Sequence, residues 1–101
     1  MNRESNYVLS ARAKQDIRQI ADYTLDNFGV NQSLAYAQAL IKVIQKLASN
    51  PELGRAYVPI KAHMVFRYRF KAHVLFYYKV PEGIFVLRVL GGKMDFERHL
   101  G

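Results

Sequence analysis

The sequence predicts an α+β fold with the element order β-α-α-β-β-β, in which a helical hairpin packs on one face of a small antiparallel sheet. Apolar residues recur at helical spacing in the first half of the chain and alternate with other residues after Gly54. Two or three residues separate the two helical stretches, which favours antiparallel neighbours. A chain of 101 residues has the length of one domain, so residues 1–101 are expected to form a single unit.

The first half begins with a short β-prone segment, residues 7–9. Ser10 is a suitable N-cap for a helix over residues 11–28, and Gly29 suits the left-handed conformation that often ends a helix. The apolar stripe of this helix comprises Ala13, Ile17, Ile20, Ala21, Thr24 and Phe28. Polar residues at its other positions, Asp16 among them, are expected in solvent.

A second helix is expected over residues 32–49, with Asn31 as its N-cap. Asn50-Pro51 ends it, because proline disfavours a helical conformation in the preceding residue. Its apolar stripe comprises Tyr36, Ala37, Leu40, Ile41, Val43, Ile44 and Leu47.

The second half is predicted to form a loop, a three-stranded meander and a tail. The loop is expected over residues 52–63, the strands over residues 64–70, 73–80 and 84–90, and the tail over residues 93–100. Lys71-Ala72 and Pro81-Glu82-Gly83 are short connections, which makes neighbouring strands antiparallel. Gly91-Gly92 ends the last strand, and the tail is long enough for one helical turn.

Alternation along the strands predicts two different faces of the sheet. The face expected against the helices comprises Phe66, Tyr68, Phe70, Val74, Phe76, Tyr78, Phe85, Leu87 and Val89. The opposite face comprises Arg67, Arg69, His73, Leu75, Tyr77, Ile84, Val86, Arg88 and Leu90. Leu75, Val86 and Leu90 would leave an apolar patch in water, so the tail or a partner chain is expected to cover this face.

Positive charge is concentrated in the second half of the chain. The formal net charge is +7; residues 1–54 hold six Lys/Arg and five Asp/Glu, and residues 55–101 hold nine and three. This distribution indicates an anionic partner, either a nucleic acid, a nucleoprotein assembly or an acidic protein. The alternative is that the basic charge serves solubility alone.

Several classes of site are disfavoured by the composition. Cysteine is absent, which excludes disulfides and thiolate chemistry. The three histidines follow no metal-binding spacing, and no glycine-rich phosphate loop is present, so neither metal nor cofactor is expected. No segment has the length and apolarity of a membrane span or a signal peptide, which predicts a cytoplasmic protein that does not enter membranes.

One acid–base set remains conceivable. Cleavage of RNA by its own 2′-hydroxyl needs a base, an acid and cations for the phosphate. His73 or His99 could transfer protons with assistance from Tyr77. The arginines that could hold the phosphate are Arg67, Arg69 and Arg88.

The order of short motifs resembles that of the ParE family of toxins along nearly the whole chain. The opening carries Tyr7, Leu9, Ser10, Ala13, Asp16, Ile17, Ile20, Tyr23 and Thr24; the helix junction carries Phe28, Gly29, Gln32 and Tyr36. The end of the second helix carries Leu47, Ala48, Asn50, Pro51, Gly54 and Arg55. The last matches are His73-Val74-Leu75-Phe76-Tyr77, Arg88-Val89-Leu90, Met94-Asp95 and His99-Leu100.

The resemblance implies a fold of the RelE/ParE type and the toxin of a type II toxin–antitoxin system. It implies a non-enzymatic inhibitor of DNA gyrase that blocks replication. It also implies a ParD-like antitoxin with a ribbon-helix-helix dimer, which forms a hetero-oligomer with the toxin. DNA would then be contacted indirectly, through the antitoxin or gyrase.

Two sets of residues follow as candidates. The target is expected to contact Arg67, Arg69, His73, Arg88, Met94, Asp95 and His99. The antitoxin is expected to contact Ile17, Tyr23, Tyr36, Leu40, Leu75, Val86 and Leu90, although core packing would also explain the four on the helices. Charge complementarity to an acidic antitoxin segment would equally explain the cations.

The sequence departs from the ParE pattern at one position. ParE chains often have a histidine after the Arg-Val/Ile-Leu strand, and Gly91 stands there in this chain. A binding module without toxicity is therefore an open alternative. The other alternative is a RelE-like, ribosome-dependent mRNA endonuclease. Such relatives use a basic cluster with a tyrosine or histidine near the C-terminus. Arg67 and Arg88 could match part of that cluster, but the tail lacks a tyrosine.

Overall fold

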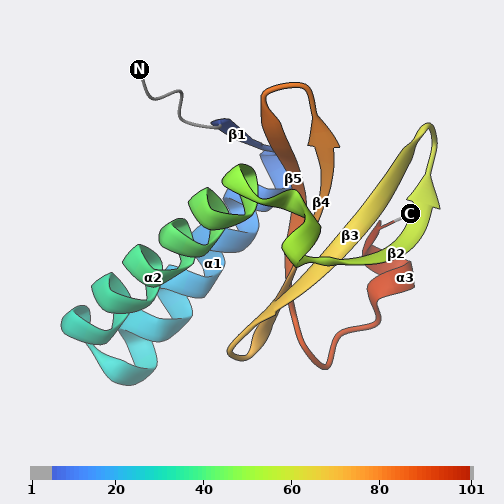
Figure 1. The fold of residues 1–101 in the computed structure, drawn as a ribbon. Helices are drawn as coiled ribbons and strands as arrows, with labels where there is room; N and C mark the ends of the chain where they lie inside the picture. Colours follow the sequence, from blue (N-terminus) through green and yellow to red (C-terminus); the bar gives the residue numbers. More distant parts are fainter. Residues whose placement is uncertain (1–5, 101) are drawn as a thin grey trace, which may run out of the picture.

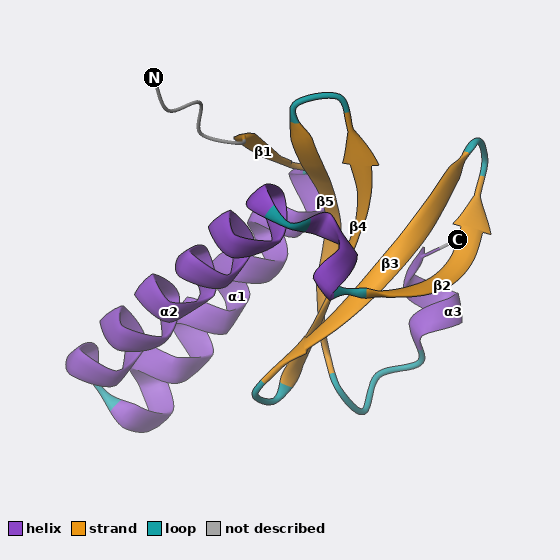
Figure 2. Cartoon of the chain, viewed as in Figure 1, coloured by secondary structure: helices purple, strands orange, loops and turns teal. Residues whose placement is uncertain are grey.

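The computed structural model describes residues 6–100 and shows a helical hairpin beside a twisted sheet (Figure 1). The elements are β1 (Asn6–Leu9), α1 (Ala11–Phe28), α2 (Val30–Ser49), a short 3-10 helix η1 (Pro51–Leu53), β2 (Arg55–Ile60), β3 (His63–Phe70), β4 (His73–Val80), β5 (Gly83–Gly91) and α3 (Phe96–Leu100). The hairpin of α1 and α2 covers one side of the sheet, and α3 lies on the other side of it (Figure 2). The predicted α+β class and the hairpin on the sheet are confirmed.

The sheet has five strands in the order β1-β5-β4-β3-β2. Strands β2 to β5 form an antiparallel meander, and β1 pairs with β5 in parallel. The prediction of a loop over residues 52–63 is wrong, because β2 pairs with β3 there. A bulge between Ala56 and Val58 interrupts the alternation of β2, and Pro59 lies where an edge strand tolerates it.

The ends of the helices are set by Ser10 and Gly29. The Ser10 hydroxyl accepts the Ala13 N–H at 2.9 Å and donates to the Leu87 carbonyl at 2.7 Å, which confirms the N-cap and ties α1 to β5. Gly29 has φ of 92° and turns the chain within a single residue. Helix α2 consequently begins at Val30, and the prediction of Asn31 as its N-cap is wrong.

The predicted faces are correct for β3 and wrong for β4. Phe66, Tyr68 and Phe70 pack toward the helices as expected. The two-residue turn pairs Phe70 with His73, and directly paired residues share a face. The helix-facing positions therefore change from even to odd numbers across the turn, so that Leu75 and Tyr77 face the helices.

The predicted faces of β5 are also largely wrong. They follow from the pairing with β4, whose faces are interchanged, and a bulge in β5 changes them once more. Ile84 and Val86 face the helices, as does Val89, because the register shifts opposite Phe76 and Tyr77 and Leu87 is the extra residue. Only Val89 of this strand was placed correctly on that face. The residues wrongly placed against the helices are Val74, Phe76, Tyr78, Phe85 and Leu87.

Two apolar clusters result. The helix-side core comprises Ala13, Leu40, Ile44, Leu47, Ala48, Leu75, Tyr77, Ile84, Val86 and Val89. The tail-side cluster comprises Val65, Val74, Phe76 and Leu90, with Tyr57, Ile60, Leu87, Phe96 and Leu100 packed against it. The predicted apolar patch of Leu75, Val86 and Leu90 is thus wrong, because the helices bury the first two and the tail-side cluster contains the third.

No helix within residues 6–100 combines the length and apolarity needed to cross a membrane.

Candidate functional site

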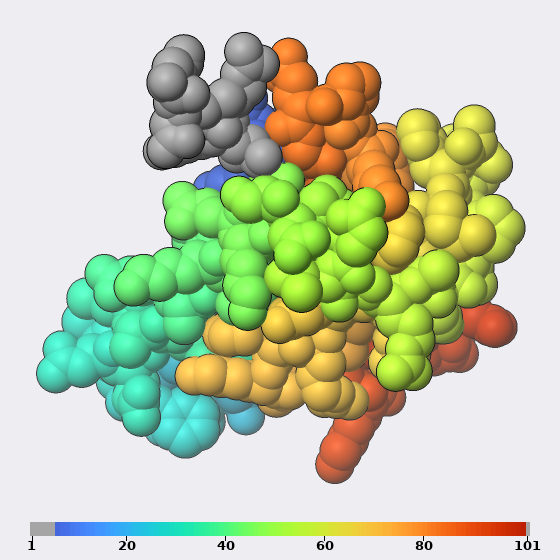
Figure 3. All heavy atoms as spheres, viewed as in Figure 1, coloured from blue at the N-terminus to red at the C-terminus, as the bar shows by residue number. Residues whose placement is uncertain are grey.

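An open groove runs between α1, the β3–β4 turn, the end of β5 and α3. We call it the α1–β5 groove. A hollow of about 470 Å³ is lined by Asp16, Gln19, Ile20, Tyr23, Ala72, His73, Arg88, Val89, Leu90, Gly91, Met94 and His99. A second hollow of about 260 Å³ shares Tyr23, Ala72 and His73 with it and continues to Thr24, Phe28, Gln32 and Tyr36. The side chains around the β3–β4 turn lie beside the hairpin, and the C-terminal segment emerges below them (Figure 3).

An ion pair between Asp16 and Arg88 forms the charged wall of the groove. Arg88 Nε donates to Asp16 Oδ2 at 2.8 Å, and Arg88 Nη2 donates to Oδ1 at 2.9 Å. The Val89 N–H also donates to Oδ2, and Arg88 Nη1 donates to the His99 carbonyl at 3.0 Å. The hydrogen bonding of the Arg88 guanidinium to the Asp16 carboxylate raises the pKa of Arg88. The guanidinium therefore links α1, β5 and α3, and its charge is largely neutralised.

The prediction of Asp16 in solvent is wrong, since the residue is only 7% exposed. A signal for this was present in the sequence. Asp16 lies three residues after Ala13 and four before Ile20, which places it on the buried side of α1. A carboxylate at such a position requires a cation from another element, because an unpaired buried charge is strongly disfavoured.

His73 faces the helices rather than the open side of the sheet. Its Nδ1 lies 2.6 Å from the Tyr36 hydroxyl. Burial lowers the pKa of His73, although the Asp16 carboxylate opposes this, and burial raises the pKa of Tyr36. At neutral pH the lowered pKa favours a neutral imidazole, which shares a hydrogen bond with the Tyr36 hydroxyl.

Tyr77 lies in the helix-side core, away from the groove. Its hydroxyl donates to the Pro51 carbonyl at 2.6 Å and accepts the Gly54 N–H at 3.0 Å. Burial raises the pKa of Tyr77 to about 12. This hydroxyl is held in a structural contact and is separated from the two histidines that line the groove.

Arg67 and Arg69 lie on the side of the sheet away from the hairpin. The Arg67 guanidinium lies 5.4 Å from the ring centres of Tyr57 and Phe96. Arg69 is exposed and donates to the Lys71 carbonyl at 3.2 Å. The predicted single cationic face is thus divided, because Arg88 and His73 belong to the groove and these two arginines do not.

The tail residues Met94 and His99 also line the groove. The Gly91 N–H donates to the Met94 sulfur at 3.2 Å, so Gly91 and the tail form one corner of the groove. Asp95 is exposed immediately before α3. Among residues 6–100, no three His, Asp or Glu side chains come together as metal ligands.

Comparison with known proteins identifies the family. The model of the ParE toxin of the type II toxin–antitoxin system parDE matches residues 7–96. Toxin ParE1 of Mycobacterium tuberculosis (strain H37Rv) is 38% identical over 97 residues, which cover 95% of this chain and 98% of that toxin. The chain belongs to the ParE toxin family. Toxin ParE1 of Caulobacter vibrioides is 35% identical over 95 residues, covering 94% of this chain and 97% of the relative.

A solved structure described as the chromosomal ParDE TA system from P. aeruginosa has the same fold. The TM-score is 0.71 at 14% identity, and the match covers 89% of this chain and 98% of that one. The two chains therefore share a fold at low sequence identity.

The seven residues expected to contact an antitoxin divide into two groups in this ParE chain. Tyr23 is 64% exposed and lines both hollows, and Tyr36 lines the second hollow. Ile17 is half-buried against the helix-side core, and the remaining four are fully buried: Leu40, Leu75, Val86 and Leu90. Phe28, expected in the apolar stripe of the first helix, is instead 62% exposed at the end of the groove and joins the candidates.

Proposed function

We propose that this ParE-family chain acts in the cytoplasm as a non-enzymatic inhibitor of DNA gyrase and that a ParD-like antitoxin neutralises it. Family membership supports the toxin role, and the Asp16–Arg88 ion pair supports the absence of catalysis. A guanidinium held by two carboxylate oxygens is poorly suited to stabilise a phosphorane. Tyr77 is likewise engaged in backbone contacts and lies outside the groove.

A supercoiling assay tests the inhibition of gyrase. The purified chain, added to gyrase with relaxed plasmid, is expected to reduce supercoiling and to leave cleaved DNA bound to the enzyme. Toxin mixed beforehand with its antitoxin is the control and should leave gyrase active. Normal supercoiling and no cleaved DNA at a large excess of free toxin would contradict the proposal.

The α1–β5 groove is the proposed docking site of the antitoxin. Its walls are mainly apolar, and Tyr23 and Phe28 remain exposed along its length. Three more apolar side chains near the end of the hairpin are also exposed: Leu25, Val30 and Leu34. Such a surface fits an amphipathic segment with apolar anchors, and acidic flanks would complement the net charge of +7.

Calorimetry with the purified antitoxin tests this docking site. Tyr23→Ala with Phe28→Ala is expected to weaken binding by tenfold or more, because truncation of an important interface side chain costs more than about 1 kcal/mol. Leu53→Ala is the matched control, since Leu53 is 41% exposed in η1, at the other end of α2. Equal affinities of the two variants would place the antitoxin elsewhere.

A second candidate function is ribosome-dependent cleavage of mRNA. It is favoured by one observation, namely that His73 and His99 line the same hollow. Primer extension on translated messages after induction of the toxin would show cuts at fixed codon positions if this activity exists. Uncut messages during growth arrest would eliminate it and leave gyrase inhibition.

A further inference from the structure

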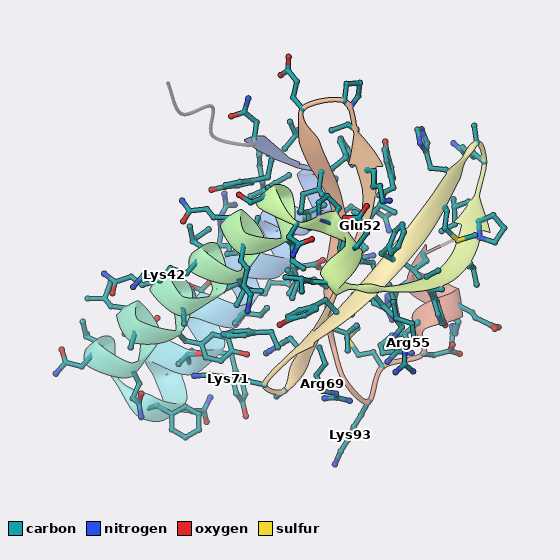
Figure 4. All side chains as sticks on the ribbon, in the orientation of Figure 1. Lys42, Glu52, Arg55, Arg69, Lys71 and Lys93 are labelled. Atoms are coloured by element: carbon teal, nitrogen blue, oxygen red, sulfur yellow. The ribbon has the colours of Figure 1, made fainter. Side chains whose placement is uncertain are left out.

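The outer side of β2 and β3 carries a row of cations outside the α1–β5 groove. Arg55 pairs directly with Arg67 across the two strands, and Arg69 follows two residues later on the same face. Arg55, Arg69 and Lys93 project from the same side of the molecule, away from Lys42 on α2 (Figure 4). We call Arg55, Arg67, Arg69 and Lys93 the cationic row.

The cationic row has no anionic partners among residues 6–100. Within that part of the chain, carboxylates form ion pairs with Lys79 and Arg88 only. Like charges directly opposite each other on neighbouring strands destabilise a sheet. The Arg55–Arg67 pairing is therefore unfavourable for folding alone and would be relieved by an external anion.

Gly92 contributes to this arrangement. A Cβ atom at Gly92 would lie 2.9 Å from Arg69 Nη1 and 3.1 Å from Nη2. A side chain at this position would push the flexible guanidinium away from the backbone at the end of β5. Arg69 thus lies beside the residue that precedes Lys93, which extends the row from the strands toward the tail.

The geometry of the row favours regularly spaced phosphates over isolated acidic side chains or unpaired bases. Three of its four members are arginines, whose planar guanidinium binds two phosphate oxygens at once. Same-face positions on a strand recur at about 6.6 Å, which suits a ligand with regularly repeated charge. Unpaired bases need open aromatic rings, but Arg67 already covers Tyr57 and Phe96.

We propose that the cationic row binds the phosphodiester backbone of duplex DNA directly. This inference extends the proposed inhibition of gyrase, an enzyme that holds duplex DNA, and replaces the indirect contact expected from the family resemblance. The toxin would then engage DNA through β2 and β3 while the groove remains a separate surface for the antitoxin. Binding would be insensitive to sequence, because backbone contacts carry no base information.

Fluorescence anisotropy with a labelled duplex, in the absence of gyrase, tests the inference. The full-length free toxin is compared with the double variant Arg55→Gln/Arg69→Gln and with Lys42→Gln/Lys46→Gln. Both variants lose two positive charges, but Lys42 and Lys46 are exposed on α2, away from the row. Thermal unfolding by circular dichroism confirms that each variant folds.

The expected result is weaker binding by the Arg55/Arg69 variant and nearly unchanged binding by the Lys42/Lys46 variant. Each lost phosphate contact lowers the slope of log K against log salt by about 0.9, so the first variant should lose about 1.8 from its slope. Equal losses in both variants would overturn the inference, because net charge alone would then explain the binding. Polyglutamate that displaces the duplex at equal charge would overturn it in favour of an acidic protein.

The same assay separates this inference from the proposed function. A toxin that stops gyrase but does not bind the duplex overturns direct DNA contact and leaves gyrase inhibition standing. A toxin that binds the duplex through the row but leaves gyrase active overturns gyrase inhibition and leaves direct DNA contact standing.

Discussion

Asp16 holds α1 against β5 through its carboxylate. Its two oxygens receive three hydrogen bonds from Arg88 and Val89, and Arg88 in turn reaches the His99 carbonyl. The side chains of Asp16 and Arg88 are 9% and 13% exposed, so water screens the pair only weakly. Asp16 therefore determines both the position of α1 on β5 and the charge inside the groove.

Replacement of Asp16 by alanine is expected to destabilise the protein by about 3–5 kcal/mol, because it leaves the Arg88 charge without a partner. Urea unfolding measures the change. Lys14→Ala, at an exposed position on the same helix, is the control and should change the free energy of unfolding by no more than about 0.5 kcal/mol. An Asp16→Ala protein as stable as this control would contradict the role given to the pair.

His73 should make stability depend on pH. Its pKa is lowered in the folded state by burial, despite the opposing Asp16 charge, so the unfolded chain binds the proton more readily. The stability from neutral His73 is therefore present above the unfolded value of about 6.5 and is lost as the pH falls toward the lower folded pKa.

The measurement is the free energy of unfolding in urea at several pH values from neutral to weakly acidic. The loss on acidification should be smaller in His73→Gln than in the parent protein. His63→Gln is the control, because His63 is exposed and stacks on Tyr78 at 3.8 Å instead of entering the groove. An identical pH profile for the parent and His73→Gln would show that His73 does not carry the effect.

At the scale of elements, the helices and the β3–β5 meander could be predicted from periodicity, but the faces of the strands could not. Helix α1 ends where Ser10 and Gly29 indicated, because capping acts locally. The faces of β4 and β5 depend on how a two-residue turn and a bulge set the register. Continuing the even-numbered positions across the Lys71-Ala72 turn interchanges the two faces of β4. Leu75 and His73 were therefore expected on the wrong side of the sheet.

Strand β2 and the groove could not be predicted from the sequence, for a different reason. A proline and a bulge obscure the alternation of β2, so its pairing with β3 becomes clear only in three dimensions. The groove joins residues of α1, β5 and the tail that are far apart in sequence. His73, Arg88, Met94 and His99, which the sequence predicts to contact the target, line the same hollow, but their partners Asp16 and Tyr36 follow from tertiary contacts.

The Tyr77 hydroxyl anchors η1 to β4, and its removal is expected to loosen this connection. Tyr77→Phe leaves the Gly54 N–H and the Pro51 carbonyl without their partner, which should cost about 1–3 kcal/mol. Urea unfolding gives the magnitude, and amide exchange at Gly54 gives the location. Tyr7→Phe, whose hydroxyl has no such role among the described hydrogen bonds, is the control. Unchanged exchange at Gly54 would contradict the anchoring.

At the scale of the whole molecule, the sheet is covered on both sides by very different amounts of chain. The hairpin of α1 and α2 covers the helix-side core, and the short α3 covers the tail-side cluster. Phe96 of α3 packs against this cluster, with its ring centre 4.8 Å from that of Phe76, and the Arg67 guanidinium lies over the Phe96 ring. The tail therefore completes the second apolar cluster of the domain.

Phe96→Ala is expected to detach α3 and to lower the free energy of unfolding by about 1–2 kcal/mol, less than the loss for a fully buried phenylalanine. Exposure of the tail-side cluster should increase the fluorescence of an apolar dye such as ANS. Phe28→Ala serves as the comparison, because Phe28 is already 62% exposed and its loss should alter neither quantity much. Dye binding equal in both variants would show that α3 does not cover the cluster.

The parallel pairing of β1 with β5 joins the two ends of the chain and affects how the protein folds. Ser10 and Leu87 lie 77 positions apart, and Asp16 and Arg88 lie 72 apart, yet each pair is in direct contact. Contacts of such high sequence separation form slowly, because a long segment must be ordered before they stabilise it. A nascent chain that stops before β5 has neither the partner of β1 nor that of Asp16. Prematurely terminated products should consequently lack the groove, so that only synthesis through β5 and the tail yields this surface.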